Sequence, residues 1–136
     1  MTAGYSGTPL AQKLSLKPGL RTWSCGMPAS VRSEIDRDAP GLTLLDTPEP
    51  PIDAAHIFVT ERAVLECRLR LLLPLIARDG FIWVSWPKKA AKVATDITED
   101  TIREVALPLG FVDTKVCAID ETWSGLKLVI RKALRG

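Results

Sequence analysis

The chain has few histidines and cysteines, the side chains that form structural zinc sites. Its 136 residues include one histidine, His56, and three cysteines, Cys25, Cys67 and Cys117, which are far apart in the sequence. There is no Cys-x-x-Cys pair, and one histidine cannot complete the ligand set of a structural zinc site. We therefore expect no metal, and three reduced, mostly buried thiols in a cytoplasmic protein.

Long apolar runs and an excess of one charge are also missing. The apolar stretch 71–77 is interrupted by Pro74, whereas a membrane span needs about 20 apolar residues, so no membrane association is expected. The first residues do not combine a basic start with an apolar core, so no signal peptide is predicted. Eighteen Lys+Arg against sixteen Asp+Glu give a net charge of +2, which disfavours a nucleic-acid partner.

What the sequence does contain is a regular alternation of predicted strands and helices. Strands are expected at 20–24, 42–45, 56–59, 81–86, 111–119 and 126–132. Helices are expected from a cap at Thr8 through Leu14, at 29–37, and from a cap at Thr98 to Gly110. A further helix is expected from a cap at Thr60 to Asp79, kinked or divided at Pro74. This order predicts an α/β fold with a mostly parallel sheet, helices on both faces and a C-terminal antiparallel hairpin.

The same pattern sets expectations for domains and core. We expect an N-terminal segment with a short helix at 1–19 and a single α/β domain at 20–136. The apolar periodicity predicts that the following side chains are buried: Leu44, Val59, Leu65, Leu69, Leu72, Val84 and Val116.

Several motifs resemble known families. Lys17-Pro18-Gly19, 79–84 (Asp-Gly-Phe-Ile-Trp-Val) and the terminal hairpin resemble a shortened, degenerate S-adenosylmethionine-dependent methyltransferase domain of the Rossmann-like class. A small bacterial family of uncharacterised proteins is similar at 4–10 (Gly-Tyr-Ser-Gly-Thr-Pro-Leu), 86–89 (Trp-Pro-Lys-Lys) and 119–126 (Ile-Asp-Glu-Thr-Trp-Ser-Gly-Leu). The resemblance implies a bacterial protein with a methyltransferase-like fold and no established activity.

The loop after the first strand departs from a working methyltransferase. Such enzymes resemble Gly-x-Gly-x-Gly there, because the backbone must approach the cofactor closely. This chain has one glycine in the loop, Gly26, and about one strand-helix unit is missing between Asp46 and His56. Asp46 follows Gly26 by twenty residues, where such folds place a ribose-binding carboxylate, although a strand-end Asp is also a common turn residue. The sequence thus requires no cofactor, and S-adenosylmethionine binding through Gly26 and Asp46 is the weaker alternative.

Two other catalytic arrangements are incomplete. Six residues separate Cys25 from Arg32, whereas a phosphatase-like phosphate loop resembles a cysteine and an arginine with five between them. His56 has no Gly-x-Ser-x-Gly nucleophile turn to serve, so a structural or surface histidine is the favoured interpretation.

A candidate ligand site follows from topology. In an open parallel sheet, ligands bind beyond the carboxyl ends of the strands, and the predicted hairpin turns at the same edge. We expect Trp86, Lys88, Asp120 and Trp123 to share one concave patch that prefers an anionic or aromatic ligand. The full candidate set is Thr60, Trp86, Lys88, Lys89, Asp120, Glu121, Trp123 and Ser124. The alternative is a structural rim, in which tryptophan rings pack under lysine stems.

Three functions stay open at this point, and the sequence does not decide whether the protein is an enzyme. The first is a non-catalytic or weakly catalytic domain that binds a small molecule on a degenerate methyltransferase-like fold. The second is an active S-adenosylmethionine-dependent methyltransferase. The third is a protein-interaction module that forms a homodimer through an uncovered sheet edge.

Overall fold

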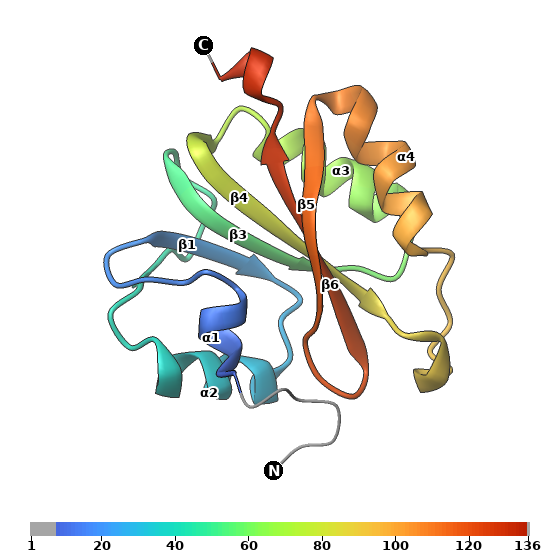
Figure 1. Cartoon of the computed structure of the whole chain (residues 1–136), viewed down its shortest axis with the longest axis horizontal. Helices are drawn as coiled ribbons and strands as arrows, with labels where there is room; N and C mark the ends of the chain where they lie inside the picture. Colours follow the sequence, from blue (N-terminus) through green and yellow to red (C-terminus); the bar gives the residue numbers. More distant parts are fainter. Residues whose placement is uncertain (1–7, 136) are drawn as a thin grey trace.

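A six-stranded sheet forms the centre of the computed structural model, which describes residues 8–135 (Figure 1). The strand order is β2-β1-β3-β4-β6-β5. The strands are β1 (Arg21–Cys25), β2 (Thr43–Leu44), β3 (Ile52–Phe58), β4 (Ile76–Pro87), β5 (Phe111–Ala118) and β6 (Trp123–Ile130). The first four strands are parallel, and β6 is antiparallel to both β4 and β5. The predicted fold class is thereby confirmed.

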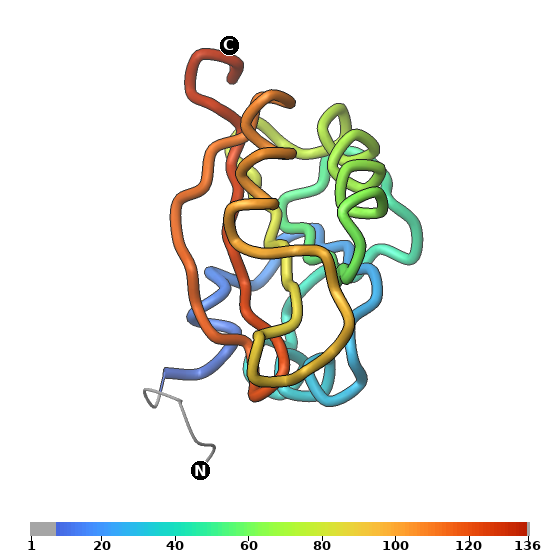
Figure 2. Tube along the Cα trace, turned by 90° about the vertical axis from the view of Figure 1, so that its right-hand side faces the viewer, coloured from blue at the N-terminus to red at the C-terminus, as the bar shows by residue number. Residues whose placement is uncertain are grey.

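Helices cover both faces of this sheet. Helices α1 (Leu10–Lys13) and α2 (Ala29–Asp38) pack on one face, and α3 (Arg62–Leu72) and α4 (Glu99–Leu109) pack on the other. Figure 2 shows the blue α1 and the green α3 on opposite sides of the strands. Two short 3-10 helices, η1 (Lys89–Ala91) and η2 (Lys132–Leu134), follow β4 and β6. No helix among residues 8–135 is long and apolar enough to cross a membrane.

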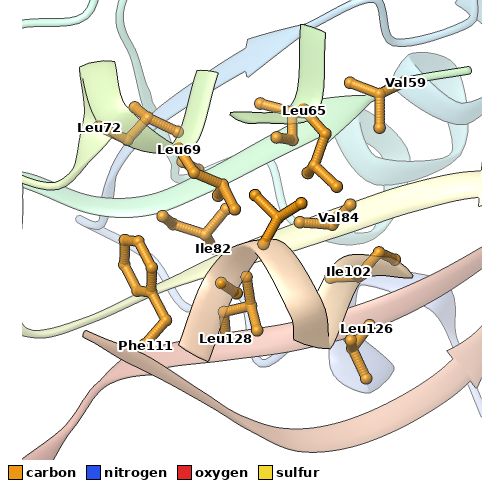
Figure 3. Packing of buried hydrophobic residues seen from close by; sticks show 14 of the residues in the cluster. Val59, Leu65, Leu69, Leu72, Ile82, Val84, Ile102, Phe111, Leu126 and Leu128 are labelled. Atoms are coloured by element: carbon orange, nitrogen blue, oxygen red, sulfur yellow. The ribbon is translucent and has the colours of Figure 1, made fainter. Parts of the chain in front are cut away.

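The larger core lies under α3 and α4 (Figure 3). Leu65, Leu69 and Leu72 form the buried stripe of α3, because spacings of three and four residues place them on one side of a helix. Ile82 and Val84 of β4 face this stripe from the sheet. The burial predicted for Val59, Val84 and the three leucines is confirmed.

Two of the residues expected in the core are instead exposed. Leu44 is 50% exposed and Val116 is 46% exposed. Each lies in a strand at one edge of the sheet, β2 or β5, where no further strand covers the outer side. The prediction of their burial was wrong because apolar character alone does not distinguish an edge strand from a central one.

The boundaries of β3, α3 and β4 also differ from expectation. Helix α3 ends at Leu72, and β4 begins at Ile76, so Gly80 lies within the strand. A Cβ atom on Gly80 would lie 2.9 Å from the carbonyl oxygens of Ile52 and Asp53, so the close approach of β3 requires glycine there. Thr60 does not cap α3; the capping position belongs to Glu61, which makes no side-chain capping hydrogen bond.

The predicted caps of α4 are confirmed. Thr98 and Thr101 form a reciprocal capping box, and Gly110 ends the helix in the left-handed conformation.

A second, smaller core lies under α1 and α2. Helix α1 begins at Leu10 after Pro9, and Leu10 and Leu14 are buried in this core. The Gly-Tyr-Ser-Gly motif at 4–7 lies outside the described residues.

Candidate functional site

The carboxyl edge of the sheet brings together segments that are distant in sequence. Strands β1, β3 and β4 end there, at Cys25, Phe58 and Pro87. The β5–β6 turn reaches the same edge because Trp123 pairs with Pro87 in the antiparallel β4–β6 ladder. The backbone N–H of Lys88 donates to the carbonyl of Thr122 at 2.8 Å, which ties the end of β4 to this turn.

A groove of about 510 Å³ opens at this edge, between the end of β4 and the start of α4. Its apolar floor includes Trp86 and Ile97, both buried, and Val93, which is 42% exposed. Lys88 and Lys89 supply positive charge at its side. The remaining lining residues are Pro87, Thr95, Thr98 and Glu99. The groove thus combines exposed apolar surface with two ammonium groups.

Of the charged residues that line the groove, Glu99 forms an ion pair but the two lysines do not. Glu99 is held by Arg103, whose Nη2 lies 2.6 Å from its carboxylate. The hydrogen bonds from Arg103 to Glu99 and then to Asp113 raise the pKa of Arg103. By contrast, no ion pair among residues 8–135 includes Lys88 or Lys89. The two lysines are therefore the uncompensated charges of the groove.

The loop that closes the groove is anchored to the start of α3. The carbonyl of Thr60 accepts from the Thr95 hydroxyl at 2.7 Å and from the Asp96 N–H at 3.3 Å. The Asp96 carboxylate accepts from the backbone N–H of Arg62 at 2.7 Å, so Asp96 occupies a free donor of the first turn of α3. Sequence reasoning missed Val93, Thr95 and Asp96. The cluster of small polar residues before Thr98 was the available signal.

The hairpin residues have structural roles in this arrangement. The carboxylate of Asp120 accepts from the backbone N–H groups of Thr122 and Trp123, both at 2.8 Å, and so closes the turn. The Trp123 ring packs edge-on against Phe58, with ring centroids 5.1 Å apart. Glu121 is exposed at the tip of the turn.

The eight candidate residues consequently do not share one concave patch. Trp86 pairs with Ser124 and Pro87 with Trp123, and successive residues of a strand point to opposite faces. Trp86 therefore faces the α3–α4 side, whereas Trp123 faces the α1–α2 side. Of the candidate set, the groove lining includes Trp86, Lys88 and Lys89, and excludes Thr60, Asp120, Glu121, Trp123 and Ser124. The expected convergence of both tryptophans was wrong because it ignored this alternation.

The alternative cofactor loop is built around Gly26. This residue has φ +72°, and a Cβ atom on it would lie 3.0 Å from the carbonyl oxygen of Phe58. Only glycine fits such a turn without strain, so the loop crosses the end of β3 at close range. Asp46 is exposed just beyond the end of β2. The flanking Cys25 and Met27 are partly buried, so this single-glycine turn fits a nucleoside cofactor less well than a loop of three glycines.

A second, very small cavity lies between α2 and the sheet. It measures about 10 Å³, which is the size of one water molecule, and its lining includes Thr22, Arg32, His56 and Trp83. His56 is buried, its Nε2 lies 2.7 Å from the Ser85 hydroxyl, and its ring stacks on Phe58. Burial and then the nearby charge of Arg32 lower the pKa of His56 to about 3. The cavity is too small for a substrate, and the structural interpretation of His56 is supported.

The metal-binding and thiol chemistry of the described residues is limited. Within residues 8–135, no group of three His, Cys, Asp or Glu residues could hold a metal ion. All three cysteines are free, but Cys67 is exposed and Cys25 and Cys117 are only partly buried, so the expectation of mostly buried thiols was wrong. Burial raises the pKa of the Cys117 thiol.

Comparison with known proteins connects this fold to one large class. No protein-family model and no curated protein matches the sequence. A precorrin-6y C5,15-methyltransferase from Geobacter metallireducens is similar in structure, with a TM-score of 0.60 and 15% identity over 97% of this chain and 93% of that one. A putative type 11 methyltransferase from Sulfolobus solfataricus has a TM-score of 0.58 and 12% identity over 90% of each chain.

A third similar structure is a TehB-like SAM-dependent methyltransferase from Corynebacterium glutamicum. Its TM-score is 0.56 and its identity 10%, over 95% of this chain and 91% of that one. At these identities the likeness defines the fold and not the activity. The chain therefore has a methyltransferase-like Rossmann fold.

Proposed function

We propose that this protein is a small-ligand-binding domain, non-catalytic or weakly catalytic, that uses the groove between β4 and α4. The observation that carries the proposal is the pairing of exposed apolar surface with uncompensated positive charge. Val93 is 42% exposed on the groove lining, and Lys88 and Lys89 stand beside it without a carboxylate partner among residues 8–135. Sites for small molecules commonly combine an apolar lining with a few placed polar groups.

The lining also supports a particular class of ligand. An anionic group placed near Lys88 and Lys89 would gain attraction from two ammonium groups, and a flat apolar part would cover Val93 and the edge of Trp86. The helix terminus adds little, because the capping box already uses the N–H of Thr101 and the hydroxyl of Thr98. Recognition of the anion thus depends on the lysines. The expected ligand is a small aromatic or heterocyclic molecule that carries a carboxylate or phosphate.

A thermal-shift screen tests the proposal with nucleotides and aromatic carboxylic acids. A ligand at about 100 times its Kd should stabilise the fold by about 2.7 kcal/mol, which is a rise in Tm of several degrees for a domain of this size. Lys88→Ala and Val93→Glu should remove that rise. Lys132→Ala is the matched control, because Lys132 is exposed in η2 and does not line the groove. If no compound shifts the native protein, or if the control variant loses the shift equally, the groove is not the binding site.

The second candidate function is methyl transfer from S-adenosylmethionine. The methyltransferase-like fold and the close Gly26 turn favour it, since a backbone without a side chain is what a cofactor loop needs. The single glycine and the bulky neighbours oppose it, so we expect weak or absent binding. Isothermal titration with S-adenosylmethionine provides the test. A Kd in the low micromolar range that Asp46→Ala abolishes and Lys88→Ala leaves unchanged would favour the transferase over the groove proposal.

A further inference from the structure

Another groove, of about 540 Å³, lies at the amino edge of the sheet, away from the groove between β4 and α4. It is lined by Arg78, Asp79, Lys132 and Arg135, and we call it the amino-edge groove. The start of β4 and the red η2 lie at this same end of the sheet in Figure 1. Ligands of open α/β sheets usually bind beyond the carboxyl ends of the strands, so this groove is independent of the site proposed above.

A bulge in β4 forms one wall of the amino-edge groove. In the β3–β4 ladder, Ile52 pairs with Ile76 and Ala54 pairs with Phe81. Two residue steps in β3 thus match five in β4, and the surplus forms a bulge at 77–80. This bulge carries the two lining residues of β4, both of which are exposed. Bulges commonly redirect side chains beside functional sites.

The turn that follows β6 forms the other wall, with Lys132 and Arg135. The β4–β6 ladder ends at the pair Phe81–Val129, so the bulge and this turn leave the sheet side by side. The guanidinium Nε of Arg135 donates to the carbonyl of Ile130 at 2.8 Å, which holds the arginine against the end of the strand. Within residues 8–135, the ammonium group of Lys132 and the two Nη atoms of Arg135 form no hydrogen bond, so their donors are available to a ligand.

The charges in the amino-edge groove do not cancel. Three cationic side chains and one carboxylate line it, and no ion pair among residues 8–135 includes any of the four. The carboxylate of Asp53, in the neighbouring strand, already accepts from the backbone N–H of Arg21 at 2.9 Å. The whole chain has a net charge of only +2, so this surplus of two positive charges is concentrated in one place. A bound anion would compensate it.

We propose that the amino-edge groove binds a small phosphate monoester that carries a hydroxyl group near its phosphate. Arg78 and Arg135 would bind the phosphate, because a guanidinium can donate two parallel hydrogen bonds to its oxygens, and Lys132 would add a point charge. An ionised carboxylate only accepts hydrogen bonds and repels a bare anion, so a ligand that fits beside Asp79 must also present a donor. A hydroxyl near the phosphate meets this requirement.

The size of the amino-edge groove agrees with a small ligand. Its volume of about 540 Å³ lies within the range of small-molecule sites, about 300–1,000 Å³. An extended nucleic acid would instead need a long basic track with many phosphate contacts, whereas three cations line this groove.

Isothermal titration calorimetry with glycerol 3-phosphate at constant ionic strength tests the proposal. Arg78→Gln should raise the Kd at least tenfold, because it removes a charge and a two-pronged donor. Arg78→Lys should recover only part of the affinity, since it restores the charge without the fork of donors. Arg37→Gln is the matched control, because Arg37 is an exposed arginine of α2 that does not line the groove, and it should change the Kd less than twofold. Lys88→Ala should also leave the Kd unchanged, which separates this site from the groove between β4 and α4.

Asp79→Asn gives a second readout that general charge attraction would not reproduce. It should weaken the binding of glycerol 3-phosphate, because a neutral amide is a poorer acceptor for the hydroxyl than a carboxylate. It should strengthen the binding of methyl phosphate, which has no hydroxyl and is only repelled by Asp79. The two Kd values should therefore change in opposite directions.

Three results would overturn the proposal: no binding of glycerol 3-phosphate, native-like binding by Arg78→Gln, or stronger binding of both probes by Asp79→Asn. Without ligand, Arg78→Gln should melt at the same temperature as the native protein, because Arg78 is exposed, so a loss of binding is not a loss of fold. Tight binding of a single-stranded oligonucleotide that glycerol 3-phosphate cannot displace would overturn the proposal in favour of a nucleic-acid surface.

Discussion

The two faces of the sheet differ in the polarity of the side chains buried under their helices. Under α3 and α4, strand residues such as Ile82 and Val84 meet leucines, and the core there is formed mainly by apolar side chains (Figure 3). Under α1 and α2, the same strands present His56, Ser85 and Trp83. There, polar atoms find partners: Trp83 Nε1 donates to the Leu14 carbonyl at 3.0 Å, and His56 pairs with Ser85. No buried side-chain polar atom among residues 8–135 lacks a hydrogen-bond partner.

The difference separates stability from charge sensitivity. An apolar interface contributes free energy that depends little on pH, because burial of apolar area is its source. The free energy that a buried polar interface contributes depends on the protonation state and on the hydrogen-bond partner of each group. The α3–α4 face should therefore determine most of the stability, and the α1–α2 face should determine how that stability responds to pH. The following substitutions test this contrast.

The largest effect is expected from Leu69→Ala in the apolar face. Leu69 is fully buried in the stripe of α3, so truncation loses buried methyl groups and leaves a cavity. Substitutions of this kind cost about 2–5 kcal/mol, measured as a lower free energy of unfolding in urea. Leu71→Ala is the matched control, because Leu71 lies in the same helix but is 41% exposed, and it should cost less than about 0.5 kcal/mol. Equal costs for the two variants would contradict the packing described for α3.

The next effect concerns His56 and acid. Burial lowers the pKa of His56 to about 3 from an ordinary value of 6.5, so the folded protein binds a proton later than the unfolded chain as pH falls. Between these values the unfolded state binds more protons, and stability rises with pH. The contribution of neutral His56 is complete above pH 6.5 and is lost progressively toward pH 3. Between pH 6 and pH 4 we expect a loss of about 2 kcal/mol from this group.

His56→Gln provides the control for that prediction. An amide can still form a hydrogen bond with the Ser85 hydroxyl, but it does not titrate. Urea unfolding of both proteins from pH 7 to pH 4 should give a shallower pH dependence for the variant, and the difference isolates His56 from the carboxylates. Parallel pH profiles would show that His56 does not titrate differently on unfolding and would remove the main distinction between the two faces.

A smaller effect is expected at the N-terminus of α4. Thr98→Ala removes the hydroxyl that accepts the backbone N–H of Thr101 in the capping box, and this loss should cost about 1 kcal/mol in the free energy of unfolding. Helix α2, on the polar face, has no side-chain capping bond, so Ser30→Ala in its first turn should change stability by less than about 0.5 kcal/mol. A cost at Ser30 equal to that at Thr98 would contradict the assignment of the cap.

The sequence predicted the elements that local patterns determine. The alternation of apolar runs with capping residues and glycines was enough for the strand and helix order, because each signal lies within a few residues of its element. The predicted end of α3 was wrong by several residues, because Gly80 was interpreted as the signal that ends the helix. In the structure Gly80 lies in β4, where the lack of a side chain lets β3 approach closely. That requirement depends on residues almost thirty positions away, which no local pattern contains.

The candidate site was predicted only in part for a similar reason. The predicted topology placed the end of β4 and the hairpin at one edge of the sheet. The structure agrees, since Lys88 is hydrogen-bonded to the turn after β5. The topology could not show that Asp120 uses its carboxylate within the turn or that Trp86 and Trp123 face opposite sides. The register of β4 with β6 decides that second point.

The smallest effect is expected for an ion pair on the outer surface of α3. The guanidinium of Arg70 lies 3.0 Å from the carboxylate of Glu66, one helical turn away, but both side chains are about half exposed. Water and salt screen such a pair, so its coupling energy should be about 0.3–0.5 kcal/mol. A double-mutant cycle with Glu66→Ala and Arg70→Ala measures that coupling, which should shrink further in 1 M salt. A coupling above about 1 kcal/mol would show that surface charge contributes to the α3–α4 side of the molecule as strongly as a helix cap does, and the assignment of its stability to apolar packing would need revision.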